Sequence, residues 1–163
     1  MTKFTVTPFD GVRLPDWNVQ FVHFIKDSQD IGADLILDWD TNSCASWVCD
    51  GIQAMTGKNP HDQFPTYNSA LGAAKAIKDA GFKTFDELLA FLFPEIPMAF
   101  VTMGDVVLVD AVLGEGEDKE VGKVMPYAMA LADPPHYWLV DPKGFSRGPL
   151  TLAKKAYAIG RVV

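Results

Sequence analysis

The sequence predicts an α+β domain in which N-terminal helices pack on a small antiparallel β-sheet. Two observations carry this prediction: amphipathic helical patterns occupy the first part of the chain, and β-branched runs occupy the rest. A third is composition, since 163 residues with 48% hydrophobic and 21% charged residues suffice for one buried core without disulfides or metal. We expect one domain over residues 14–163, preceded by an arm over residues 1–13.

The arm contains T-K-F-T-V-T-P-F, which has the alternation of a short strand. Such a segment can dock on a partner protein by strand addition or by burying aromatic side chains, here Phe4 and Phe9. We therefore expect the arm to contact a partner, and its deletion to spare the fold.

The first predicted helix begins at Pro15, because proline is favoured in the first turn of a helix. Apolar side chains then recur at i, i+4, i+7 and i+8, which predicts a half-buried face. These side chains are Trp17, Phe21, Phe24 and Ile25.

The second predicted helix lies in the run N-S-C-A-S-W-V-C-D-G-I-Q-A-M-T-G, from Asn42 to Gly57, and carries Cys44 in its first turn. A helix start leaves backbone N–H groups unpaired and has positive dipole character. A thiol there can be held as a thiolate with a pKa of roughly 4 to 7. Cys49 lies on another side of the helix and is expected to be structural. The two thiols should not bridge.

Two further helices are predicted before the sheet. The alanine-rich segment 69–80 ends at Gly81, which favours close packing against its neighbours. The segment T-F-D-E, from Thr84 to Glu87, is a capping box that predicts a helix start, and Pro94 should end that helix.

The strands follow. The run M-G-D-V-V-L-V-D-A (103–111) predicts a strand buried on both faces, and an acidic loop is expected over 114–122. The next strand is V-M-P-Y-A-M-A-L-A, in which Pro126 must sit at an edge, a bulge or the strand start. A strand at 136–141, a short helix or turn at 149–156 and a last strand complete the chain.

Composition and motifs exclude several function classes. The formal charge of −7 and the scattered lysines and arginines argue against nucleic acid as the main partner. No Cys/His pattern at metal-ligand spacing and no phosphate-binding glycine motif occurs, so neither a metal nor another cofactor is predicted. The most apolar stretch is interrupted by prolines and is too short for a membrane span.

The order of these motifs resembles a family of uncharacterised phage and prophage proteins. The resemblance rests on C-A-S-W-V-C-D-G-I-Q-A-M-T-G, S-A-L-G-A-A-K-A-I-K-D-A-G and G-D-V-V-L-V, and extends from about Leu14 to Val163. That family is in turn similar to the NlpC/P60 papain-like hydrolases, so the resemblance implies a papain-like fold. It also implies that Cys44 matches the nucleophile position of those enzymes.

The resemblance places a base histidine at the start of the strand that contains Pro126, yet that strand has no histidine. Asp141 could take the place of the polar residue that orients the base. Of the three histidines, His23 is expected at the edge of the core or in solvent. His61 is expected four to five helical turns from the thiol. His136 is left as the only candidate base.

We therefore expect a structural or assembly component of a phage virion, in the tail, on a cysteine-hydrolase scaffold without its base. The expected partners are other virion proteins, and free thiols favour synthesis in the host cytoplasm. The alternative is an active cysteine peptidoglycan hydrolase, an amidase or endopeptidase, in which Cys44 is the nucleophile. His136, or a histidine brought in by rearrangement of the fold, then relays the proton, and Asp141 orients that base. A third possibility is a nonvirion protein that acts on the host.

Overall fold

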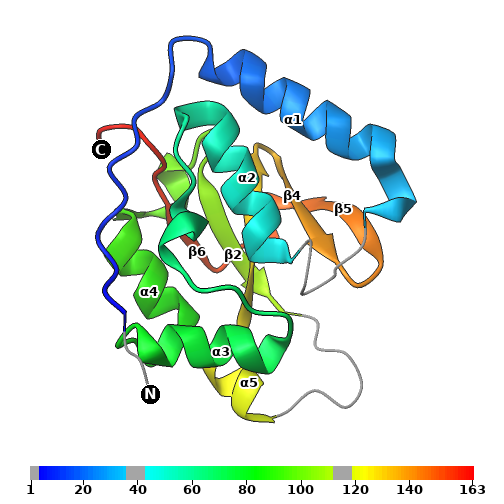
Figure 1. The fold of residues 1–163 in the computed structure, drawn as a ribbon. Helices are drawn as coiled ribbons and strands as arrows, with labels where there is room; N and C mark the ends of the chain where they lie inside the picture. Colours follow the sequence, from blue (N-terminus) through cyan, green and yellow to red (C-terminus); the bar gives the residue numbers. More distant parts are fainter. Residues whose placement is uncertain (1–3, 36–42, 112–118) are drawn as a thin grey trace.

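The computed structural model describes residues 4–35, 43–111 and 119–163 (Figure 1). It contains helices packed on one side of an antiparallel sheet, so the predicted α+β class is correct. The α-helices of the described residues are α1 (Trp17–Ile31), α2 (Cys44–Thr56), α3 (Ala70–Asp79), α4 (Phe85–Leu92) and α5 (Lys119–Val124). The strands are β1 (Glu95–Ile96), β2 (Val106–Asp110), β3 (Tyr127–Asp133), β4 (His136–Asp141), β5 (Gly144–Pro149) and β6 (Lys155–Tyr157).

The helix boundaries follow from capping groups. The Ser43 side chain caps α2 at its start, and Gly57 ends it with a left-handed φ of 81°. Thr84 caps α4 by accepting a hydrogen bond from the Glu87 amide, while the Glu87 carboxylate accepts one from the Lys83 amide. The predicted capping box is therefore present, with its second bond displaced by one residue.

The six strands form one sheet in the order β1-β6-β2-β3-β4-β5, and every neighbouring pair is antiparallel. Strand β2 lies inside the sheet, and four of its five residues are buried, as its β-branched run predicts. Pro126 directly precedes β3, which is one of the three positions allowed for it.

The sheet opens between β3 and β4. Their paired residues extend from Asp133↔His136 only to Leu131↔Trp138, whereas β4 pairs with β5 along its whole length. The first half of β3 therefore has β2 on one side but no matching length of β4 on the other. This opening faces the start of α2, which contacts both β3 and β4.

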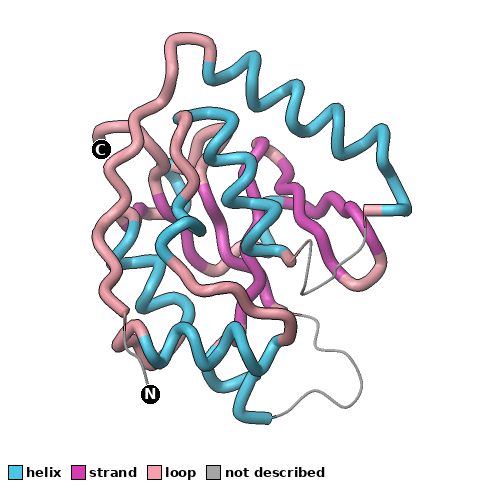
Figure 2. The backbone as a smooth tube through the Cα atoms, in the orientation of Figure 1, coloured by secondary structure: helices cyan, strands magenta, loops and turns pink. Residues whose placement is uncertain are grey.

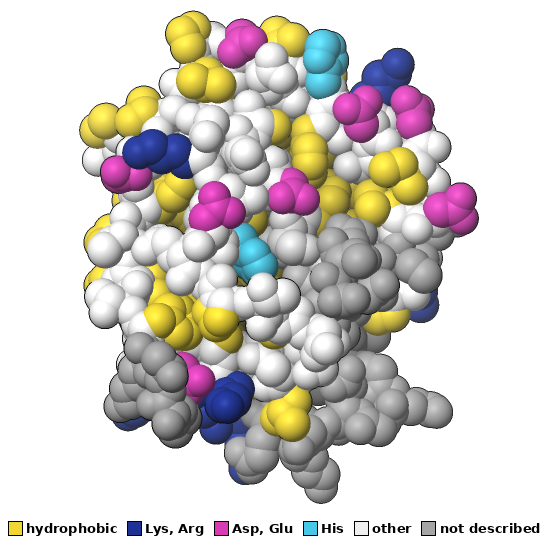
Figure 3. Space-filling model, in the orientation of Figure 1, with side chains coloured by type: hydrophobic (Ala, Val, Ile, Leu, Met, Phe, Trp, Pro, Cys, Tyr) yellow, Lys and Arg dark blue, Asp and Glu magenta, His cyan; other side chains and the backbone are white. Residues whose placement is uncertain are grey.

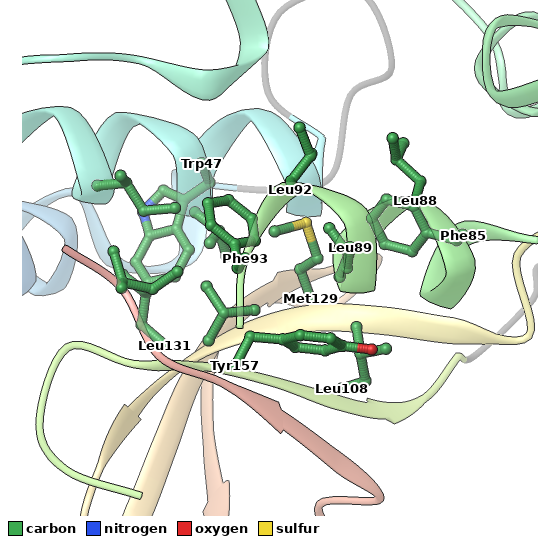
Figure 4. Close-up of a cluster of buried hydrophobic side chains, with 14 of the residues drawn as sticks. Trp47, Phe85, Leu88, Leu89, Leu92, Phe93, Leu108, Met129, Leu131 and Tyr157 are labelled. Atoms are coloured by element: carbon green, nitrogen blue, oxygen red, sulfur yellow. The ribbon is translucent and has the colours of Figure 1, made fainter. Parts of the chain in front are cut away.

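The main core lies between the helices and one face of the sheet (Figure 4). Trp47 of α2 and Leu89 of α4 meet Leu108, Met129 and Leu131 of the sheet there. The Trp47 indole nitrogen donates a 3.0 Å hydrogen bond to the Ser28 hydroxyl, which fixes α1 on α2. A smaller apolar cluster covers the opposite face of the sheet.

Four segments differ from the sequence-based expectations. The predicted acidic loop over 114–122 ends in helix α5, which begins at Lys119, and its residues 114–118 lie outside the described part. Strand β5 was not expected, and the sheet begins with β1 rather than β2. The last strand covers only three residues, because it pairs with β1 and β2 and then leaves the sheet.

The predicted arm packs on its own domain over residues 4–13, where it runs as an irregular segment beside the C-terminal loop (Figure 2). Phe9 lies edge-on to Phe93 with ring centroids 5.5 Å apart, and Phe4 lies edge-on to Phe64 at 5.6 Å. The expectation that a partner protein buries Phe4 and Phe9 is therefore wrong, since both side chains pack against the core of this chain.

A buried carboxylate joins the arm to the sheet. Asp105, at the start of β2, is fully buried and accepts hydrogen bonds from Arg13 at 3.0 Å and from Arg161 at 2.6 Å. The backbone amides of Thr102 and Ile159 donate to the same carboxylate at 2.9 and 3.2 Å. Deletion of residues 1–13 would remove Arg13, one of the two arginines that pair with the buried Asp105 carboxylate. The deletion should therefore destabilise the fold, contrary to the expectation that it spares the fold.

Asp105→Asn should lower the free energy of unfolding by about 3–5 kcal/mol, because two arginines would lose their buried counter-ion. Urea denaturation followed by circular dichroism measures this change. Asp10→Asn is the matched control, since Asp10 forms an exposed ion pair with Lys58 and should leave stability nearly unchanged. Equal stabilities for Asp105→Asn and the wild type would show that the carboxylate does not hold these segments together.

Candidate functional site

A cavity of about 280 Å³ lies where α2, α3, α4 and α5 meet the opening between β3 and β4. Cys44 and Asp141 both line it, and so do His61 and Tyr67 from the segment after α2. Most of its remaining wall is aliphatic or aromatic.

Cys44 is the first residue of α2. The Ser46 amide donates a 3.0 Å hydrogen bond to the Ser43 hydroxyl, and the Ser43 amide donates a 2.8 Å hydrogen bond to the Ser46 hydroxyl. This reciprocal cap fixes the first turn of the helix and hence the direction of the Cys44 side chain. The thiol is presented to β3 at the opening in the sheet.

The structure does not support a thiolate at Cys44. Burial raises the pKa of the Cys44 thiol, while the nearby backbone amides of Met129, Ala45 and Cys44 itself act in the opposite direction and lower it. The expectation of a pKa of roughly 4 to 7 is therefore wrong, because desolvation outweighs the helix start. Cys49 is buried, and burial raises its pKa as well, in agreement with a structural role.

Asp141 lines the cavity but serves a turn. One carboxylate oxygen accepts a 2.7 Å hydrogen bond from the Lys143 amide, and the other accepts one from the Ser146 hydroxyl at 3.2 Å. Both oxygens thus hold the connection between β4 and β5. The carboxylate that was expected to orient a base contacts no imidazole among the described residues.

His136 lies at the opposite end of β4 from Asp141 and pairs with Asp133. Asp141 is five positions further along β4, which is about 16 Å along a strand at 3.3 Å per residue. His136 does not belong to the cavity wall. The structure therefore brings together two of the three predicted site residues, Cys44 and Asp141, and places the third elsewhere.

The sequence predicts His61 four to five helical turns from the thiol, beyond the end of α2. This prediction is wrong, because His61 and Cys44 line the same cavity. The chain turns back after α2 through a 3-10 turn at Pro60–Gln63, so that the His61 amide reaches the Cys49 sulfur. His61 therefore lies beside the middle of α2 rather than beyond its far end. The N-P pair that precedes His61 is a turn signal and was the one clue in the sequence to this return.

His61 is joined to Tyr67, a residue that the sequence analysis did not single out. The His61 Nε2 and the Tyr67 hydroxyl lie 2.9 Å apart. Burial raises the pKa of Tyr67 to about 12. A hydrogen bond with the Ser43 side chain lowers this pKa but has the smaller effect. Burial also lowers the pKa of His61. Tyr67 thus connects His61 to the cap of α2, and the imidazole is engaged by a phenol rather than by the thiol.

The described residues offer no group of three or more His, Cys, Asp or Glu side chains placed to hold a metal ion. No helix among them is long and apolar enough to cross a membrane. His23, the remaining histidine, is exposed on α1. No imidazole of the described part therefore bonds to Cys44.

The fold and the site together define the class of this protein. It is an α+β protein in which a capped helix places a thiol at the opening between two antiparallel strands, β3 and β4. A family model matches this chain over residues 12–159, and the chain belongs to that family, which is described as a domain of unknown function, DUF6950. A search of curated proteins gave no match, and neither did a search of solved structures.

Alkylation of Cys44 should require alkaline pH. The variant Cys49→Ala leaves Cys44 as the only thiol, and its rate of reaction with iodoacetamide should reach half its maximum above pH 9 rather than near neutrality, since burial disfavours the thiolate. The same variant unfolded in urea is the reference, with a pKa of about 8.5. A half-maximal rate at or below pH 7 in the folded variant would contradict the raised pKa.

Proposed function

We propose that this chain is a structural or assembly component of a phage virion, in its tail, built on a cysteine-hydrolase-like scaffold that has no catalytic activity. The observation that carries the second part is the environment of Cys44: the His61 imidazole is hydrogen-bonded to the Tyr67 hydroxyl, and His136 lies at the far end of β4. Burial also raises the pKa of the Cys44 thiol. Acyl transfer needs a group that takes the thiol proton, and the described residues place none there.

The assignment to a virion rests on the resemblance to phage and prophage proteins drawn from the motifs around Cys44 and the segment G-D-V-V-L-V. The surface is compatible with protein partners. Acidic and basic side chains are dispersed over the face seen in Figure 3 and form no basic patch there for nucleic acid. Under this proposal the protein is made in the host cytoplasm and its partners are other tail proteins.

A second candidate function is a cysteine hydrolase that cleaves peptidoglycan. It is favoured by one observation, namely that Cys44, Asp141 and His61 line the same cavity. In that function Cys44 would attack the scissile carbonyl of a peptide or amide bond and a histidine would take the thiol proton. His136 would have to leave the far end of β4 to do so, and His61 would have to leave Tyr67.

Peptidoglycan clearing separates the two functions. Purified wild-type protein should clear peptidoglycan no faster than Cys44→Ala, because the thiol has no base. Cys49→Ala is the control for loss of a buried thiol from the same helix. Clearing by the wild type and by Cys49→Ala, together with its loss in a folded Cys44→Ala, would establish the hydrolase instead.

Incorporation into particles tests the structural role. Mass spectrometry of purified virions from the encoding phage or prophage should detect the protein at a constant ratio to the other tail proteins. Cys44→Ala should be incorporated at the wild-type level, because the proposed role needs no chemistry at the thiol. Absence of the wild-type protein from purified particles would exclude the virion role.

A further inference from the structure

We propose that the cavity beside Cys44 binds a neutral, largely apolar small molecule of about ten to twelve non-hydrogen atoms, such as a medium-length hydrocarbon chain with an uncharged end. This inference is independent of the virion role, since it rests on the cavity alone. Three features carry it: the walls, the size and the pairing of the polar groups.

The deep wall of the cavity is apolar. It is made by the inward faces of α3, α4 and α5, with Ala76, Leu88 and Leu92 among the lining residues, and by Met129 of β3. All four side chains are nearly inaccessible to solvent or belong to the buried core. Walls of this kind favour hydrocarbon over water, which needs two to four polar partners at each site.

The size of the cavity sets the size of the ligand. A cavity of about 150 Å³ lined by Leu, Ile and Phe is known to hold benzene, which has six carbon atoms. The cavity here, at about 280 Å³, has nearly twice that volume. It therefore fits a molecule of about ten to twelve non-hydrogen atoms. The exposed residues Pro142 and Arg147 also belong to its wall, so the cavity reaches the surface beside the turn between β4 and β5.

The polar groups at the cavity are already paired. The Tyr67 hydroxyl bonds to His61, and Met129 provides an amide to Cys44. Both oxygens of Asp141 are held by its own turn. Among the described residues no buried side-chain nitrogen or oxygen lacks a hydrogen-bond partner. The charged side chains of the lining are two carboxylates, Asp110 and Asp141, and one guanidinium, Arg147, and both Asp110 and Arg147 are exposed to solvent. An anionic ligand would therefore meet more negative than positive charge, and its buried part would meet apolar walls, which favours a neutral ligand.

The probe for the test is 1-decanol, which has eleven non-hydrogen atoms, with decanoate as its charged counterpart. Isothermal titration calorimetry of the full chain should show one decanol site. Decanoate should bind at least about tenfold more weakly, because its carboxylate would be desolvated. Binding of decanol should also slow the alkylation of Cys44, which lines the same cavity.

Two variants on α3 provide the matched comparison. Ala76→Leu fills the cavity and should weaken decanol binding at least about tenfold, whereas Leu71→Ala alters an exposed residue of the same helix and should bind as the wild type does. Leu92→Ala enlarges the cavity and should shift the preference to 1-dodecanol. This third variant keeps the test decisive if Ala76→Leu does not fold.

Absence of decanol binding to the wild type would overturn the proposal. Equal binding by Ala76→Leu and the wild type would also overturn it, because the ligand would then lie elsewhere. Tighter binding of decanoate than of decanol would reject the neutral ligand.

Discussion

The buried carboxylate of Asp105 is the constraint on which the rest of the structure depends. Taking a charge out of water costs several kcal/mol unless it is paired and hydrogen-bonded, so the segments that carry Arg13 and Arg161 must meet at the start of β2. Gly104 makes this approach possible, since its φ is 90° and a side chain there would collide with Met55. The start of the central strand is thereby fixed between the arm and the C-terminal segment, and the register of β2 with β3 follows from it.

The packing of α2 against β3 and β4 decides the ionisation of Cys44. Two effects compete at the thiol: the positive end of a helix, worth about 0.3–1 kcal/mol at exposed sites, and the desolvation of a thiolate, which is larger when the group is buried. The amide of Met129 adds to the first effect but does not reverse the result. A helix start thus prepares a thiol for ionisation only if the surrounding elements leave it in contact with water or supply a cation. Here α2 packs against an apolar sheet, so Cys44 is only partly exposed, and no cation of the described residues acts on its thiol.

The parts of the fold that the sequence predicts are those with local physical causes. The cap at Thr84, the left-handed turn at Gly81 after α3 and the buried run of β2 are decided by neighbouring residues. Strand β5 is not predicted, because glycine and proline weaken the strand pattern of G-F-S-R-G-P. The strand forms because it pairs with β4 along its whole length. In the site, the sequence places Cys44 correctly but not its pKa. Burial depends on helices and strands distant in the sequence, and the return of His61 depends on the geometry of one turn.

The cavity and the missing base are separate properties of the same scaffold. A base would have to come from the first half of β3 or from the segment around His61, whereas the deep wall comes from α3, α4 and α5. Under the proposed function, the absence of a histidine from β3 leaves the thiol without a base and does not close the space lined by these helices. Since β3 and β4 separate at this point, neighbouring strand residues do not fill that space either. Under the proposed function, the scaffold lacks catalysis at one position and keeps a site for an apolar molecule, because binding and proton transfer are assigned to different elements.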